Sequence, residues 1–279
     1  MTSPTFDRRQ LLQRGGLTVA LAVLVAACGE DSAEEEAPGR VGYAPPATPL
    51  PTVETNDIVY LRTTTSIEQT LVETYERIAE LGALDGPDAA MLERLIEDHR
   101  AAVAATVELT TAAGGEPYEC ANSWYVQRVV TPILELIEGD EAQDIPPSDD
   151  PTRDSLVVLH GMESMVGAMY QQMVELVTVV ELRAELMVFG AAAARHSAAV
   201  AIAATGAPDG YINPELVGGE LLPDESGLLP LYAIATTFGA LTPIPLTIGA
   251  PNEAGTRTTI SLETPAANSF VYEGESCDA

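Results

Sequence analysis

The chain has 279 residues and a formal net charge of −29, and all 13 of its basic residues are arginines. Charge this negative argues against nucleic acid as a partner and keeps a protein hydrated and soluble. About 225 residues remain after the N-terminal segments described next, which is enough for one domain with a well-filled core.

Residues 1–27 have the features of an export signal. Arg8 and Arg9 form a twin-arginine motif, an apolar run follows from 15 to 27, and residues 25–28 have the form of a lipoprotein cleavage box that ends at Cys28. The run is short for a permanent span, which needs about 20 apolar residues, although an uncleaved signal anchor is the alternative. We therefore expect a lipoprotein, exported folded by the twin-arginine route and held by Cys28 in the cell membrane, on its extracytoplasmic face.

The next segment, residues 28–54, is rich in Glu, Ala and Pro. Such a composition cannot bury a core, so we predict an acidic tether. With Cys28 assigned to the lipid, Cys120 and Cys277 remain in a compartment that permits disulfides, and a bond between them is the simplest hypothesis. Two free buried thiols are the alternative.

Four stretches have the length and periodicity of helices, at about 57–81, 87–113, from Pro151 to about 178, and about 179–204. Glycines end three of them, at 82, 114 and 206, and Asp150 precedes Pro151 as a cap. The boundary between the third and the fourth predicted helix contains neither Gly nor Pro. Residues 178–181 have capping-box spacing, so we place the turn there, and one continuous helix of about fifty residues is the alternative.

The remaining segments are less regular. We expect a short helix around 123–137 in the long crossover of residues 115–149. Residues 244–248 and 257–262 could form a β-hairpin within an irregular C-terminal extension, 207–279, that wraps the helices.

The first two and the last two long helices carry the same pattern. Glu68 is followed by Tyr75 seven residues later and by His99, and Glu163 is followed in the same way by Tyr170 and His196, with Glu-to-His separations of 31 and 33 residues. This internal repeat predicts two helical hairpins that pack face to face as an all-α four-helix bundle. At 1.5 Å per residue, each Glu lies at nearly the height of its His.

The repeated Glu and His side chains lie on apolar helix faces, where an ionised group needs a partner or a metal. Imidazole nitrogens and carboxylate oxygens suit iron, manganese or zinc, so we predict that the four residues bind one such ion. His160, one turn from Glu163, is a further candidate ligand or a supporting donor, and a core histidine is the alternative. Bonded Glu–His or Glu–Tyr pairs without metal are the alternative for the whole set, with Tyr75 and Tyr170 as partners of the opposite hairpin's glutamates.

The duplicated Glu-x6-Tyr and His pattern, the long crossover, the export signal and the tail of residues 263–273 resemble the ferritin-like superfamily, and within it the exported bacterial ferritin-like domains. The resemblance covers about residues 55–206. It implies a di-iron site with one Glu from each of two helices and Glu-x-x-His from each of the other two. Here Ile96 and Ala193 occupy the positions of those two carboxylates, which argues against the oxidase chemistry of the superfamily.

Two functions follow from the sequence. The first is a membrane-anchored, extracytoplasmic ferritin-like protein that binds a single divalent metal in a degenerate di-iron site. The alternative is a metal-free structural or interaction module of the cell envelope, which the missing carboxylates favour.

Overall fold

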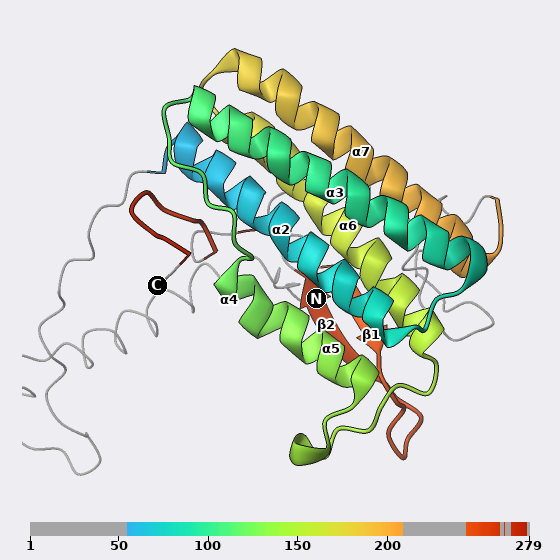
Figure 1. Cartoon of the computed structure of the whole chain (residues 1–279). Helices are drawn as coiled ribbons and strands as arrows, with labels where there is room; N and C mark the ends of the chain where they lie inside the picture. Colours follow the sequence, from blue (N-terminus) through green and yellow to red (C-terminus); the bar gives the residue numbers. More distant parts are fainter. Residues whose placement is uncertain (1–54, 209–243, 263–264, 266–268, 278–279) are drawn as a thin grey trace, which may run out of the picture. The chain divides into compact units, whose positions relative to one another are not determined.

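The computed structural model describes residues 55–208, 244–262, 265 and 269–277. These residues are mostly helical, with one small two-stranded sheet (Figure 1). The predicted export signal, the lipidation site Cys28 and the tether lie outside the described residues, as do residues 209–243 of the predicted C-terminal extension.

The first helical hairpin consists of α2 (Asp57–Leu81) and α3 (Gly86–Ala112). Asn56 caps α2, since its side-chain oxygen accepts a hydrogen bond from the Val59 amide at 3.0 Å. Gly82 ends the helix in the left-handed conformation, with φ of 63°. Pro87 lies in the first turn of α3, where its missing N–H costs no hydrogen bond. These boundaries agree with the predicted ones within one residue.

The second hairpin consists of α6 (Pro151–Leu176) and α7 (Val180–Thr205), which pack closely along each other. The helical conformation is interrupted at residues 177–179, so the alternative of one continuous helix is wrong. The predicted capping box is also wrong, because the N-cap of α7 is Val179, which has no side-chain cap. Instead, the carboxylate of Asp57 on α2 accepts hydrogen bonds from the amides of Thr178 and Val179 at 2.8 and 3.0 Å.

The crossover contains α4 (Ser123–Tyr125), the π-helical turn η2 (Val126–Val130), α5 (Thr131–Glu138) and the 3₁₀ turn η3 (Glu141–Gln143). The first three are continuous and match the helix predicted around 123–137. Pro132 lies in the first turn of α5 and has no N–H to donate to the preceding turn, which has the wider π-helical form. In Figure 1 this helical segment lies alongside α2.

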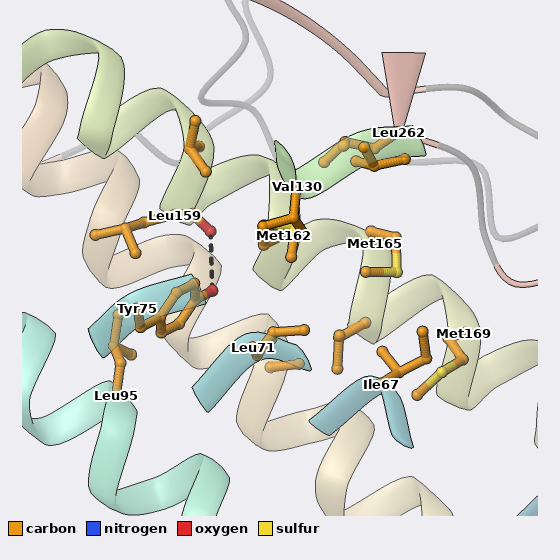
Figure 2. Packing of buried hydrophobic residues seen from close by; sticks show 14 of the residues in the cluster. Ile67, Leu71, Tyr75, Leu95, Val130, Leu159, Met162, Met165, Met169 and Leu262 are labelled. Carbon is orange, nitrogen blue, oxygen red and sulfur yellow. Dashed lines mark hydrogen bonds between the residues drawn. The ribbon is translucent and has the colours of Figure 1, made fainter. Parts of the chain in front are cut away.

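The two strands, β1 (Ile244–Ile248) and β2 (Thr258–Leu262), form an antiparallel hairpin in the register that pairs Ile244 with Leu262. This confirms the predicted strands within one residue. The sheet packs on α6 at Gly161, where a Cβ would collide with the side chain of Leu246. Figure 2 shows Leu262 beside the core, where three methionines of α6 pack against α2; these are Met162, Met165 and Met169.

The C-terminal segment lies against the first hairpin. Val271 donates its amide hydrogen to the hydroxyl of Thr63 at 2.9 Å, and Arg62 donates to the carbonyl of Glu275 at 2.6 Å. Cys277 is paired with Cys120 in a disulfide with a Cα–Cα distance of 5.8 Å. The predicted cysteine pairing is therefore present, and these described parts of the extension pack against the helices.

Candidate metal centre

The four residues of the repeated Glu/His pattern come from four different helices, with Glu68 on α2, His99 on α3, Glu163 on α6 and His196 on α7. Glu68, His99 and Glu163 are buried, with exposed fractions of 1%, 3% and 0%. The side chain of His196 is 15% exposed. Each of these side chains lies on the inward face of its helix, and the same face carries the surrounding core residues.

His99 bridges the two hairpins. Its Nδ1 lies 2.6 Å from a carboxylate oxygen of Glu68, and its Nε2 lies 2.8 Å from a carboxylate oxygen of Glu163. Both carboxylates act as acceptors. Both hydrogen bonds of His99 therefore form when both ring nitrogens carry hydrogen, which makes the imidazole positively charged.

The two tyrosines of the repeat cross between the hairpins. The hydroxyl of Tyr75 on α2 donates to Glu163 at 3.0 Å, and the hydroxyl of Tyr170 on α6 donates to Glu68 at 2.5 Å. Each tyrosine thus follows one glutamate in the sequence and bonds to the other. The pattern gives each buried carboxylate a hydroxyl donor besides His99.

His196 has a different pair of neighbours. Its Nδ1 lies 3.3 Å from Glu163 and its Nε2 lies 3.2 Å from Asp98 on α3. Asp98 is held in turn by a salt bridge of 2.8 Å with Arg94, one turn earlier. Asp98 was not predicted as a site residue, because it points away from the face of α3 that carries His99. The i, i+4 pair with Arg94 is the sequence signal that marks it as an ordered carboxylate.

Charge within this cluster shifts the pKa values of its members. Burial by itself lowers the pKa of His99, but the carboxylates of Glu163 and Glu68 raise it to about 10. Burial raises the pKa of Glu163, but the charge of His99 and hydrogen bonds from His196 and His99 lower it to about 2. Burial, and then the charge of Glu163 or Glu68, raises the pKa of Tyr75 and of Tyr170 well above the usual range. The cluster at neutral pH therefore contains an imidazolium between carboxylates.

Three of the four predicted ligands form a group that could hold a metal ion. His99, Glu163 and His196 each offer one ligand atom, and these atoms all lie within 4.8 Å of one another. Glu68 is outside this group, because it bonds to the Nδ1 of His99 and not to the nitrogen that faces Glu163. His160 is buried on α6 and is likewise outside the group. Ile96 and Ala193, at the positions of the absent carboxylates, are buried and apolar.

A cleft of about 400 Å³ adjoins the cluster. Its walls include His99, His196 and Asp98, alanines of α3 and α7, and two arginines, Arg94 and Arg195. A larger hollow of about 730 Å³ near Arg77 contains no histidine and shares no residue with this cleft. The cleft therefore gives His99 and His196 an approach from solvent, whereas Glu163 is not part of its walls.

Comparisons with protein-family models, with curated proteins and with solved structures found no match to this chain. The geometry of the cluster is therefore the basis on which a function is proposed below.

Proposed function

We propose that this protein is a ferritin-like four-helix bundle that binds a single divalent transition-metal ion through His99, Glu163 and His196. The observation that carries the proposal is the convergence of two imidazoles and one carboxylate within 4.8 Å. The side-by-side arrangement of two helical hairpins with one Glu and one His each supports the ferritin-like assignment. Anchoring in the membrane through Cys28 rests on the N-terminal sequence alone.

The donor set fits a first-row metal. Two histidines and one carboxylate are the ligands of mononuclear iron sites with open coordination positions, and the same atoms suit manganese and zinc. When bound, such an ion would supply a Lewis acid or a redox centre. The residues of this chain would hold it, and the cleft of about 400 Å³ would leave its remaining positions reachable from solvent.

The neighbours of the two histidines also fit a metal site. Metal-binding histidines usually donate their other ring nitrogen to a carboxylate, which fixes the orientation of the ring. Glu68 lies at the Nδ1 of His99 and Asp98 at the Nε2 of His196, in each case on the side of the ring away from Glu163. In this proposal Glu68 and Asp98 position the ligands and do not bind the ion themselves.

A proton competes with the ion for this site. Because carboxylates raise the pKa of His99 to about 10, the ring must lose a proton before Nε2 can bind a metal. The affinity for the ion therefore increases with pH. Without metal, protonated His99 supplies a positive charge between Glu68 and Glu163. With metal, the ion supplies positive charge there instead.

A metal-free structural role is the second candidate, and one observation favours it. Both ring nitrogens of His99 already have carboxylate partners, and both buried glutamates have tyrosine donors. This network satisfies its polar groups and ties α2, α3 and α6 together without any ion.

Metal binding by matched variants distinguishes the two candidates. The full chain is stripped with a chelator, titrated with Co²⁺, Mn²⁺ and Zn²⁺, and analysed for bound metal and for the absorption of ligated Co²⁺. We expect about one equivalent in the wild type and in the control His160→Gln, and a loss of at least tenfold in affinity for Glu163→Gln and His196→Gln.

Circular dichroism checks that each variant is folded. Much less than one equivalent in the wild type, with all variants folded, would leave the metal-free role as the explanation. Equal binding by His196→Gln and His160→Gln would exclude the proposed ligand set.

A further inference from the structure

Helix α7 is apolar on two opposite sides. One side packs into the protein through residues such as Leu182, Leu186 and Val200, which are buried. The other side is exposed and still apolar, with exposed fractions of 67% at Val180, 42% at Met187 and 61% at Val188. In Figure 1, α7 lies at the edge of the four long helices. An exposed apolar face this long in a protein of net charge −29 marks an interaction surface.

The exposed apolar residues follow a heptad spacing. Six residues alternate in separation between four and three; they are the exposed Val180, Ala184, Met187, Ala191 and Ala194 and the half-buried Ala198. On a straight helix, at 100° per residue, they lie within about 80° of one another. Most are alanine, which lets another backbone approach closely. A narrow seam of this kind fits the side of a second helix.

A lipid bilayer fits this seam less well. Length and composition alone would let α7 cross a membrane. However, helices that lie in a bilayer surface have a broad apolar face with basic residues beside it. The exposed apolar face of α7 has acidic Glu181 as well as basic Arg195 at its edge.

Two charged residues flank the seam on one edge. Glu181 and Arg195 stand seven residues before and seven residues after Val188, so all three share one heptad position. Both are exposed, and neither has a hydrogen bond or ion pair within the described ranges 55–208, 244–262, 265 and 269–277. They cannot pair within one helix, because 14 residues of helix separate them by about 21 Å.

Two antiparallel copies of α7 would bring these charges together. With the two-fold axis level with residue 189, each Glu181 is offset by about 3 Å along the helix from the Arg195 of the other copy, a distance that these long side chains can span. The same register places Val180 opposite Ala198, Ala184 opposite Ala194 and Met187 opposite Ala191, so large and small side chains alternate across the seam. One register thus satisfies both the apolar seam and the flanking charges.

We propose that α7 is the interface of a homodimer, in which two copies pair antiparallel with the two-fold axis level with residue 189 and with reciprocal Glu181–Arg195 ion pairs. The apolar seam lies on the side of α7 away from His196, whereas Arg195 at its edge also lines the cleft beside the candidate metal centre. The occupant is a second copy of this chain, because the charges complement each other only between copies.

A charge-swap series tests the proposal. The full chain is examined by sedimentation equilibrium in density-matched detergent, with the fraction of dimer as the readout. Glu181→Arg and Arg195→Glu each replace two attractive pairs by two repulsive ones, so each should weaken dimerisation about tenfold or more. The double variant Glu181→Arg/Arg195→Glu should restore it. A double variant no better than either single one would overturn the proposal.

Cross-linking provides a second test that leaves the charges unchanged. Val188→Cys should give a disulfide-linked dimer under mild oxidation, because Val188 lies next to the axis and thus close to its own copy. The control Glu185→Cys is on the same helix and exposed, but it lies off the seam. A wild-type chain that remains monomeric, with this face covered by its own residues 209–243 or by added lipid vesicles, would overturn the proposal. Equal cross-linking of the two cysteine variants would do the same.

Discussion

The single residue that organises the centre of this protein is His99. It is 3% exposed and yet has a carboxylate group beside each ring nitrogen, at 2.6 and 2.8 Å. A buried charge is costly without partners, and a buried pair that loses one partner is destabilised by about 3–5 kcal/mol. His99 is therefore as important to the fold as to any ion that it binds.

The charged state of His99 predicts the pH dependence of stability. In the folded protein its pKa is raised to about 10, from 6.5. The stabilisation is therefore complete below pH 6.5 and is lost as the pH rises towards 10. The pKa of Glu163 is lowered to about 2, from 4.5, so its stabilisation is complete above pH 4.5 and is lost as the pH falls towards 2. We expect the metal-free protein to be most stabilised by this cluster between these limits.

Urea unfolding of chelator-treated protein at pH 6 and pH 9 measures how much stability is lost as the pH rises. The free energy of unfolding should decrease by up to about 1.4 kcal/mol per pH unit in the wild type. His99→Gln lacks the titrating group and should show a flatter dependence. The same slope in both proteins would show that His99 is not charged when buried.

Sequence reasoning found the members of the cluster but not all of their connections. The repeated spacing identified Glu68, His99, Glu163 and His196 as buried polar residues of four helices. It could not indicate which ring nitrogen faces which carboxylate, because that depends on the rotation of the side chains. It also missed Asp98, which points away from the face of α3 that carries His99 and contacts His196 on α7 instead.

At the level of helices and strands, the ends with local signals were predicted closely. The first hairpin begins at Asp57 and the strands at Ile244 and Thr258, where a cap, a glycine or a turn supplies the signal. The break between α6 and α7 has no such local signal. Its position was near the predicted one, but its cause is Asp57, more than 100 residues away in the sequence. A contact of this range cannot be read from neighbouring residues.

Asp57→Ala should therefore loosen the break between α6 and α7. Three donors lose their acceptor, namely the amides of Thr178 and Val179 and the Thr178 hydroxyl, although this site is near solvent. We expect a loss of about 1–2 kcal/mol in the free energy of unfolding, and faster hydrogen exchange at both amides.

The matched control for this change is Asp85→Ala. Asp85 is the N-cap of α3, but its side chain makes no capping hydrogen bond. Its replacement should change the free energy of unfolding by less than about 0.5 kcal/mol. Equal effects of the two substitutions would mean that Asp57 does not hold the break.

For the described part of the whole molecule, the disulfide fixes the C-terminal segment to the crossover across 157 residues of sequence. We expect Cys277→Ser to lower the free energy of unfolding by about 2–4 kcal/mol, because it releases a constraint on the unfolded chain. Urea unfolding with and without a reducing agent measures this. The reducing agent should destabilise the wild type and leave Cys277→Ser unchanged, and a wild type insensitive to reduction would contradict the prediction.

The crossed tyrosines have a consequence for the history of the duplication. In each hairpin, the glutamate accepts a hydrogen bond from a tyrosine of the other hairpin. Tyr170 donates to Glu68, and Tyr75 donates to Glu163. Two identical hairpins side by side would satisfy each other by symmetry. Pairing of two such hairpins therefore supplies a hydroxyl donor to both buried glutamates at once. The bond from Asp98 to His196 marks where the two halves have since diverged.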